Sequence, residues 1–450
     1  MRPAAATPLR TVVVGLGQTG LSVARFLLAR GARVAVTDSR AAPPELQRIR
    51  ALGEDVVVRT GGCDLGLLEH ADLVVVSPGV ALTGPFFEAA RARGLGIVGD
   101  IELFARAARA SVVGITGTNG KSTVTTLLAR MAQGAGLAMR AGGNLGAPAL
   151  DLLDSSVQLY ILELSSFQLE TTESLQLAAA AVLNVTPDHL DRYRNLAAYA
   201  GAKARIFARC DVAVINLDDP LVAAMVGPGR RRLSFSLRAD VGADYALMRR
   251  EDDAWWLMRR AEALLAFSQM RLSGLHNAAN ALAALALGEA LALPRAACVA
   301  ALRDFTGLAH RTQWVAEIGG VRYVNDSKGT NVGATLAAVA GMPGPLIVIA
   351  GGDGKGQDFS PLRAAFAGKV RAAVLIGRDA RLLGQALQGA SELHYAGSLE
   401  AAVECAARLA RPGDTVLLSP ACASLDQFSS YLARGERFCA LVRACPGSGS

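Results

Sequence analysis

The order of apolar and polar positions along the chain predicts an α/β fold. Short β-branched or apolar runs alternate with glycine-rich or polar turns and with helical, often alanine-rich segments. Strands separated by helices in this way are typical of parallel sheets with helices on their faces. We therefore expect strands near residues 11–14, 33–37, 73–76, 112–115, 159–164, 179–184, 212–217, 321–324, 346–350 and 415–418.

One stretch departs from this pattern. Between residues 230 and 271, apolar alternation and turn residues replace the helical period, which predicts antiparallel hairpins. A chain of 450 residues, at about 150 residues per domain, should hold three domains. We expect an N-terminal domain over 1–99, a central domain over 100–307 with a small antiparallel sheet added to it, and a C-terminal domain over 308–450.

Two glycine-rich turns, at 15–20 and 114–123, are the first candidates for ligand-binding sites. The turn at 15–20 lies between a strand and an apolar helix, and Asp38 ends the following strand. This is the dinucleotide-binding fingerprint, although such a turn also packs a helix on a strand or holds another phosphate. The turn at 77–80 is either a ligand contact at a strand end or an ordinary Pro-Gly turn.

The second glycine-rich turn, at 114–123, reads Gly-Ile-Thr-Gly-Thr-Asn-Gly-Lys-Ser-Thr. Backbone N–H groups at the start of the following helix should cradle phosphates, with Lys121 on the outer phosphates and Ser122 on a magnesium ion. A strict Walker pattern has glycine at the position of Ile115, whereas here the glycine is one residue earlier. The mechanical parts of a phosphate loop are nevertheless all present.

Further polar residues lie in or beyond the central strands. Glu163 interrupts the apolar run 159–164, and its burial is costly unless it meets a cation such as a magnesium ion shared with Ser122. His189 lies between two aspartates beyond a strand end, which favours a site over a surface loop. Lys203 alone would be a solvated helical lysine.

Two features of the later chain also suggest ligands. Asn277 and Asn280 share the first turn of an alanine-rich helix, where they either recognise a purine or cap the helix. In the last domain, three strands lead into polar turns at 325–331, 351–355 and 419–428. Three such turns at one edge of a sheet favour a ligand surface.

Composition narrows the class of protein. With 52% hydrophobic and 19% charged residues the chain is globular, and its net charge of +7 is scattered rather than gathered into a nucleic-acid groove. Seven cysteines without a Cys-x-x-Cys pair indicate a reducing cytoplasm. No signal peptide or membrane span is apparent, so we expect a cytoplasmic protein. We also expect it to be a monomer.

Taken together, the motifs resemble the Mur ligases of peptidoglycan precursor synthesis over about residues 10–440. The resemblance rests on residues 117–123, 163–168, 184–193, 276–280, 310–311, 325–331, 351–355 and 419–428. It implies a Rossmann-like UDP-binding domain, a central P-loop domain of the ATPase type, and a Rossmann-like C-terminal domain that binds D-glutamate and closes over ATP. It also implies an ATP-dependent ligation of UDP-N-acetylmuramoyl-L-alanine to D-glutamate through an acyl phosphate.

The resemblance also assigns roles to residues. The implied catalytic residues are Lys121, Asn144, Glu163, His189 and Lys203. Two magnesium ions would be held by Ser122, Glu163, His189 and a carbamylated Lys203. The implied ATP-binding residues are Gly117, Thr118, Asn119, Gly120, Lys121, Ser122, Thr123, Asn277, Asn280, His310, Arg311, Asp326 and Lys328. The UDP-sugar would be held by Gln18, Thr19, Ser39, Arg40, Ser77, Pro78, Gly79, Asn144 and His189. D-glutamate would be held by Thr330, Lys355, Ser424 and Tyr431, the last in place of the family's phenylalanine.

Two kinds of alternative stay open. Within the superfamily, they are a ligase for another amino acid or dipeptide and a folylpolyglutamate synthetase. A diamino-acid ligase should carry an Asn-Pro-Arg turn in the last domain, and this sequence has none there. From a different class, an NAD-dependent oxidoreductase would use the turn at 15–20 and Asp38, but it would leave Lys121, Glu163 and Lys355 without a role. A non-enzymatic nucleotide switch would need the phosphate loop but not the polar turns of the last domain.

Overall fold

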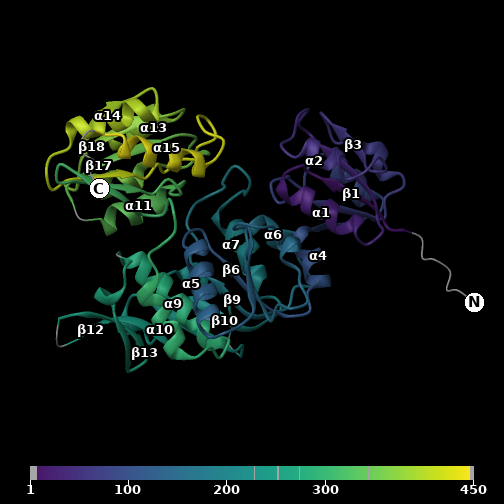
Figure 1. The fold of residues 1–450 in the computed structure, drawn as a ribbon, viewed down its shortest axis with the longest axis horizontal. Helices are drawn as coiled ribbons and strands as arrows, with labels where there is room; N and C mark the ends of the chain where they lie inside the picture. The colour runs from purple at the N-terminus through teal and green to yellow at the C-terminus, as the bar shows by residue number, and fades with distance from the viewer. Residues whose placement is uncertain (1–7, 228, 251–252, 273, 343, 446–450) are drawn as a thin grey trace, which may run out of the picture.

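The computed structural model describes residues 8–227, 229–250, 253–272, 274–342 and 344–445. In this described part the strands form three sheets, of five, nine and six strands. Figure 1 shows them as three lobes, with the N-terminal and C-terminal lobes on either side of the central one. The predicted α/β fold is confirmed.

The N-terminal sheet has the strand order β3-β2-β1-β4-β5, and all its strand pairs are parallel. Its strands are β1 (Arg10–Val14), β2 (Arg33–Asp38), β3 (Val57–Thr60), β4 (Leu73–Val76) and β5 (Gly96–Gly99), and its helices are α1 (Gln18–Leu28), α2 (Leu46–Arg50) and α3 (Pro85–Ala92). Val13 packs into one apolar cluster and its neighbours Val12 and Val14 into another. Both faces are therefore covered, which explains the uninterrupted valine run.

The central sheet has the order β7-β8-β6-β9-β10-β11-β12-β13-β14. Its strands are β6 (Ser111–Thr116), β7 (Met139–Gly143), β8 (Leu159–Glu163), β9 (Leu177–Val182), β10 (Cys210–Asn216), β11 (Arg232–Ser236), β12 (Tyr245–Arg249), β13 (Trp255–Arg259) and β14 (Glu262–Ala266). Its helices are α4 (Asp100–Ala107), α5 (Lys121–Gly134), α6 (Ser166–Glu170), α7 (Leu196–Ala204), α8 (Pro220–Ala223), α9 (Leu275–Ala290) and α10 (Arg295–Asp304). Since β8, β6 and β9 are neighbours, the turns after them meet at one edge.

The prediction of antiparallel hairpins over 230–271 is only partly right. Strands β12, β13 and β14 are antiparallel, but β11 runs parallel to both of its neighbours. The antiparallel strands continue the central sheet rather than standing apart from it. Alternation of apolar residues has the same period in both kinds of pairing, so the sequence does not distinguish them.

The C-terminal sheet has the order β15-β16-β20-β17-β18-β19. Its strands are β15 (Gln313–Ile318), β16 (Val321–Asn325), β17 (Leu346–Gly351), β18 (Val370–Ile376), β19 (Glu392–Tyr395) and β20 (Thr415–Leu418), and its helices are α11 (Val332–Gly341), α12 (Ser360–Phe366), α13 (Ala380–Leu387), α14 (Leu399–Leu409) and α15 (Tyr431–Arg443). Strand β20 lies parallel between β16 and β17. The three polar turns that follow these strands therefore share one edge, as predicted.

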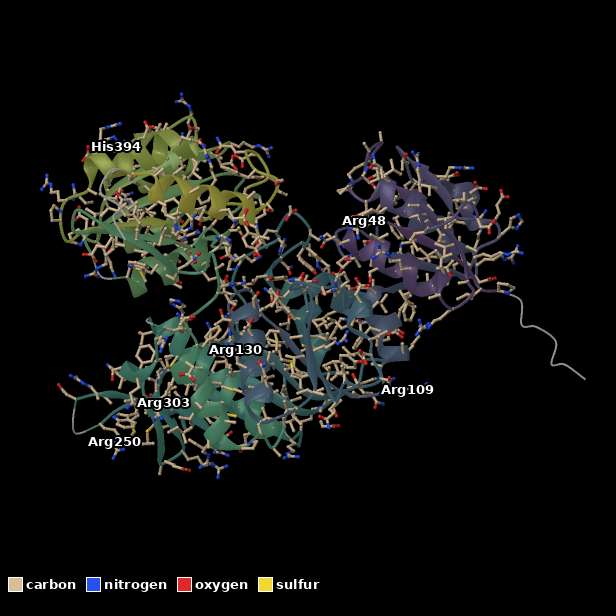
Figure 2. All side chains as sticks on the ribbon, in the orientation of Figure 1. Arg48, Arg109, Arg130, Arg250, Arg303 and His394 are labelled. Carbon is tan, nitrogen blue, oxygen red and sulfur yellow. The ribbon has the colours of Figure 1, made fainter. Side chains whose placement is uncertain are left out.

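Surface charge and helix length complete the description. The arginines labelled in Figure 2 are spread over the N-terminal and central lobes. Among the described residues, no helix combines the length and the apolar composition needed to cross a lipid bilayer.

Candidate functional site

The phosphate loop joins the end of β6 to the start of α5. Gly117 and Gly120 have φ of +151° and +85°, a region that favours glycine. A Cβ on Gly120 would also lie 2.3 Å from Asn280 Oδ1. Asn184, beyond β9, holds the loop: its backbone oxygen accepts from Thr118 N at 2.9 Å and its Oδ1 from Asn119 N at 2.8 Å. The loop is fixed before any ligand arrives.

A buried carboxylate lies directly beside this loop. Ser122 Oγ donates to Glu163 Oε2 at 2.5 Å, and Asn144 Nδ2 donates to Oε1 at 2.7 Å. Burial raises the pKa of Glu163, but the charge of Lys121 and these two hydrogen bonds outweigh it, so the pKa lies below its usual range. Lys121 Nζ donates to the carbonyls of Gly117 and Thr118, both at 2.8 Å. Glu163 is therefore an anion facing the phosphate loop.

Lys203 and His189 stand on the other side of the loop, among aromatic rings. Lys203 is only 1% exposed, donates from Nζ to Gly117 O at 2.9 Å, and lies 4.3 Å from the centroid of the Tyr199 ring. Burial, with the charge of Lys121, lowers the pKa of Lys203 well below its usual value. Burial likewise lowers the pKa of His189, whose ring lies 5.0 Å from that of Phe167. The prediction that Lys203 alone would be solvated is wrong, because α7 turns it inward.

One cavity of about 270 Å³ brings residues of the central and C-terminal domains together. Its walls include Lys121, Asn144, Glu163, His189, Lys203, Arg311, Lys328, Thr330 and Lys355. Hydrogen bonds that cross between the domains include Arg311 Nη2 to Ser122 Oγ at 2.7 Å, Lys355 Nζ to Asp188 Oδ1 at 2.8 Å, and Asn331 Nδ2 to Asn119 Oδ1 at 3.3 Å. The phosphate loop thus faces the turns of the last domain.

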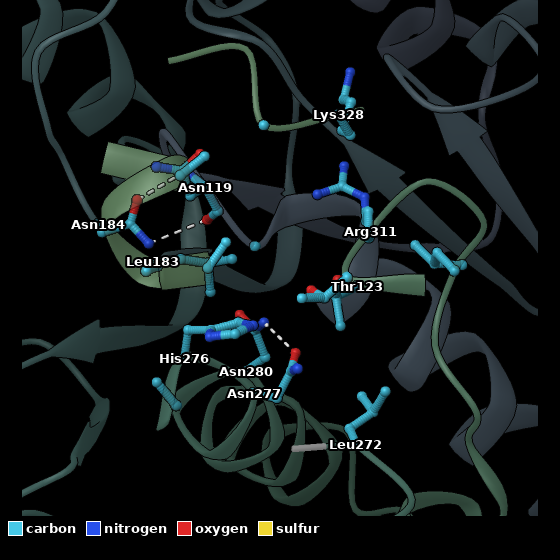
Figure 3. A pocket seen from close by; sticks show the side chains of 18 of the residues that line it. Asn119, Thr123, Leu183, Asn184, Leu272, His276, Asn277, Asn280, Arg311 and Lys328 are labelled. Atoms are coloured by element: carbon cyan, nitrogen blue, oxygen red, sulfur yellow. Dashed lines mark hydrogen bonds between the residues drawn. The ribbon is translucent and has the colours of Figure 1, made fainter. Parts of the chain in front are cut away.

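A second cavity, of about 250 Å³, opens beside the phosphate loop. Figure 3 shows Asn277 and Asn280 on one side of it, with Arg311 and Lys328 on another. Asn280 Nδ2 donates to Asn277 Oδ1 at 3.3 Å, and the helix N-cap is Gly274, which has no side chain to cap with. Burial, with the charges of Arg311 and Lys121, lowers the pKa of Lys328 to about 7, and burial raises that of Asp326, also on this wall, to about 6.

The largest of these three cavities, about 630 Å³, is lined by the first domain and by a few residues of the central domain. Its walls bring together the residues that the resemblance implies for a UDP-sugar: Gln18, Thr19, Ser39, Arg40, Ser77, Pro78, Gly79 and Asn144. Asp38 also lines it, with both carboxylate oxygens engaged by Leu16 N and by the backbone and guanidinium of Arg40. Burial raises the pKa of Asp38, but these bonds outweigh it and hold the pKa at about 2.

Five of the predicted residues lie off the described walls of these cavities: Gly117 and Ser122 of the phosphate loop, and His310, Ser424 and Tyr431. The His310 ring is buried against Gly435, where a Cβ would lie 2.3 Å from Nδ1, and Nδ1 is 2.9 Å from Asn325 Nδ2. Ser424 is buried at 3% exposure. The Tyr431 ring lies against Lys328, whose Nζ is 3.9 Å from the ring centroid. Gly435 lies within helix α15, and no sequence pattern indicates that it packs against the ring of His310.

Sequence reasoning assigned no role to several residues that shape the site. Asn184 and Asp188 lie within the stretch 184–193, on which the family resemblance partly rests. Their position just after a strand is the sequence feature that indicates a role in the site. Arg434 was missed entirely, although it is 1% exposed. Residues 434, 435, 438, 439 and 442 form the buried stripe of α15, so the helical period itself places this arginine inward.

The donor set fits a hard divalent cation. Among the described residues, no group of three or more His, Cys, Asp or Glu side chains could hold a metal ion. However, the hydroxyl of Ser122 and the carboxylate of Glu163 are in direct contact at the start of α5, where the first backbone N–H groups of a helix are free to bind an anion. Oxygen donors beside a phosphate site suit Mg²⁺, which is usually held by one or two carboxylates and substrate phosphates.

Comparison with protein families covers all three sheets. The Mur ligase MurD-like N-terminal domain matches residues 9–99, the Mur ligase middle domain matches 115–288, and the Mur ligase glutamate ligase domain matches 310–422. The family resemblance drawn from the motifs is therefore confirmed.

Relatives extend the likeness along nearly the whole chain. The chain is 55% identical to UDP-N-acetylmuramoylalanine–D-glutamate ligase of Nitrosococcus oceani, over 96% of each chain. It is 51% identical to the ligase of the same name from Methylococcus capsulatus, over 97% of this chain and 95% of that one. In fold it is similar to UDP-N-acetylmuramate-alanine ligase of Thermotoga maritima, with a TM-score of 0.63 at 19% identity over 97% of this chain and 99% of that one.

Proposed function

The chain belongs to the Mur ligase family, and we propose that it joins D-glutamate to UDP-N-acetylmuramoyl-L-alanine, converting ATP to ADP and phosphate. This is an amide-bond-forming ligase reaction of peptidoglycan precursor synthesis. We assign residues 1–99 to the UDP-substrate domain, 100–307 to the ATP domain and 308–450 to the domain that binds D-glutamate and closes over ATP. The working unit is a monomer in the cytoplasm.

The observation that carries the proposal is the shared cavity. Lys121 and Glu163 of the central domain and Lys355 of the last domain line the same walls. Phosphorylation of one carboxylate and attack by an amino acid on the product must occur at neighbouring points, because the acyl phosphate is lost to water otherwise. A nucleotide switch or an oxidoreductase has no use for this arrangement.

The reaction proceeds in two displacements. An oxygen of the alanyl carboxylate attacks the γ-phosphorus of ATP, the bond to the bridging oxygen breaks, and ADP leaves with the electron pair. The amine of D-glutamate then attacks the acyl carbon, a tetrahedral intermediate forms, and phosphate leaves as the amine gives up its proton. Lys121 holds the β- and γ-phosphates and Asn144 the transferred phosphoryl group, so charge is neutralised where it accumulates.

Magnesium completes the proposed site. Ser122 and Glu163 would hold one ion, and His189 and a carbamylated Lys203 a second. When bound, these ions supply positive charge to the phosphate oxygens. The lowered pKa of Lys203 favours its neutral amine, the form that attacks carbon dioxide and loses a proton to give a carbamate. The neutral form of His189 is also the one that binds metals.

The remaining assignments follow the cavities. Gln18, Thr19, Ser39, Arg40 and residues 77–79 hold the UDP portion, with Asn144 and His189 nearer the reacting end. Asn277 and Asn280 face the purine, and Asp326 the ribose. Thr330, Lys355, Ser424 and Tyr431 hold D-glutamate.

A coupled assay tests the proposal. The protein is incubated with ATP, magnesium, UDP-N-acetylmuramoyl-L-alanine and either D- or L-glutamate, and phosphate release is measured. We expect release with D-glutamate only. Equal release with both enantiomers, or with neither, contradicts the proposed function, and release with another amino acid supports a different Mur ligase.

A further inference from the structure

Arg434 is a buried cation that the mechanism above does not use. It lies in the first turn of α15, and at 1% exposure it heads the largest fully buried side chains of the protein. No acidic side chain among the described residues forms an ion pair with it. Burial lowers the pKa of its guanidinium to about 10. An unpaired buried charge is expensive, so it calls for an explanation.

Its hydrogen bonds go to two of the three polar turns. Arg434 Nε donates to Ser327 Oγ at 3.0 Å, and Nη2 donates to Ser327 O at 2.9 Å. On the other turn, Nη2 donates to Cys422 O at 3.1 Å and Nη1 to Ala423 O at 3.4 Å. Every acceptor is neutral, and the carboxylates of Asp326 and Asp426 act on the positive charge without forming an ion pair with it.

The third turn is attached to the second. Ala423 and Asp353 exchange two backbone hydrogen bonds, of 2.8 and 3.0 Å. Arg434 therefore fixes, directly or through one bridge, the segments that precede Lys328, Ser424 and Lys355. The planar guanidinium of an arginine carries five N–H donors in fixed directions, so it can join several carbonyl groups of two turns better than a lysine ammonium can.

We propose that Arg434 is a positioning residue for the D-glutamate site: its guanidinium aligns the three turns that present Lys328, Lys355 and Ser424, and its charge, which no ion pair neutralises, favours a dicarboxylate over them. The proposal rests on the proposed function. Burial of a charge without an ion pair is costly, and an anionic substrate compensates for part of that cost.

Two substitutions separate alignment from charge. Arg434→Met removes the charge and the fork, and Arg434→Lys keeps the charge but removes the fork. We expect the KM for D-glutamate to rise by about tenfold or more in Arg434→Met, equivalent to one lost charge-assisted contact. The KM for the UDP-sugar should stay within about twofold, since that substrate lies on the first domain, and Arg434→Lys should fall between.

Stability gives a second readout. Arg434→Met leaves the buried oxygens of Ser327, Cys422 and Ala423 without their donor, so this variant should melt below the wild type, and Arg434→Lys, which keeps a donor, should melt between the two. The matched control is Arg437→Met on the same helix, whose guanidinium is half-exposed and pairs with Glu400 at 2.6 Å. It should change neither KM.

The outcomes are distinguishable. An unchanged KM for D-glutamate in both Arg434 variants, or equal rises in the KM values for D-glutamate and the UDP-sugar, overturns the inference. If Arg434→Met does not fold, Arg434→Lys alone decides by the same criterion. If the proposed function itself is wrong, the wild type releases no phosphate in response to D-glutamate. The inference is then tested by the rise in melting temperature that glutarate, a dicarboxylate, causes in the wild type and in each Arg434 variant.

Discussion

The glycine-rich turns at 15–20 and 114–123 share a backbone design but differ in what surrounds them. Each follows a parallel strand and leads into a helix, with Gly15 at positive φ in the first turn and Gly117 and Gly120 in the second. Around the first turn, Asp38 accepts hydrogen bonds from Leu16 and Arg40, and none of the described residues that line the cavity is a lysine. Around the second, Lys121, Glu163 and Lys203 converge. In both turns the backbone can bind an anion, and the neighbouring side chains determine whether the site only binds a ligand or also supports a reaction.

This difference also bears on the oxidoreductase alternative. In dinucleotide enzymes the acidic residue at the end of the second strand accepts hydrogen bonds from the ribose. Here the two oxygens of Asp38 already accept four hydrogen bonds from the protein. The sequence matches the dinucleotide fingerprint, but Asp38 holds Arg40 and is not free for a ribose. The turn therefore suits a phosphate or diphosphate group rather than a nicotinamide dinucleotide.

Removing the lysine of the second turn should give the largest effect. Lys121→Ala is expected to lower kcat for phosphate release by about a thousandfold or more, because it removes charge stabilisation at the transferred phosphate. The matched change in the first turn, Gln18→Ala, should leave kcat within about twofold and alter only the KM for the UDP-sugar. Steady-state kinetics measure both, and comparable losses of kcat would refute the division between binding and reacting turns.

The second lysine should differ from the first in how it can be rescued. Lys203→Ala is expected to lower kcat by about a hundredfold, as the loss of a metal-site residue does. Acetate or formate in the buffer should restore part of that activity, since their oxygens replace those of the carbamate, whereas Lys121→Ala should gain nothing from either. Circular dichroism checks the fold. A folded Lys203→Ala that neither anion rescues would speak against a carbamate.

The two turns also show what sequence reasoning can reach. Glu163 was identifiable because a carboxylate in an apolar strand demands a cation, and the structure places it 2.5 Å from Ser122. The three C-terminal turns were identifiable because parallel strands end at one edge. These inferences need only local pattern and the rules of parallel sheets.

Other features depend on the three-dimensional path of the chain. Strand β20 comes last in its sheet yet lies between β16 and β17, and no local pattern encodes that order. Lys203 looks like a solvated helical residue, and only the packing of α7 buries it. Arg434 is more instructive, because its position on the buried stripe of α15 follows from the helical period of the sequence.

The smallest expected effect concerns the carboxylate of the first turn and its dependence on pH. The pKa of Asp38 is about 2 in the folded protein, below its ordinary value of 3.8. A depressed pKa contributes stability that is fully present above about pH 4 and is lost as the pH falls through 2. Asp38→Asn should therefore melt about 2–4 °C below the wild type at pH 7, with the gap closing as the pH approaches 2.

The control for this effect is Asp304→Asn, at an exposed position on α10, which should follow the wild type at every pH. Activity adds a check on the comparison between the turns. Because Asp38 fixes Arg40, its loss should raise the KM for the UDP-sugar while kcat stays near that of the wild type. A fall in kcat without a change in that KM would mean that the first turn takes part in the chemistry, and the division between the two turns would no longer hold.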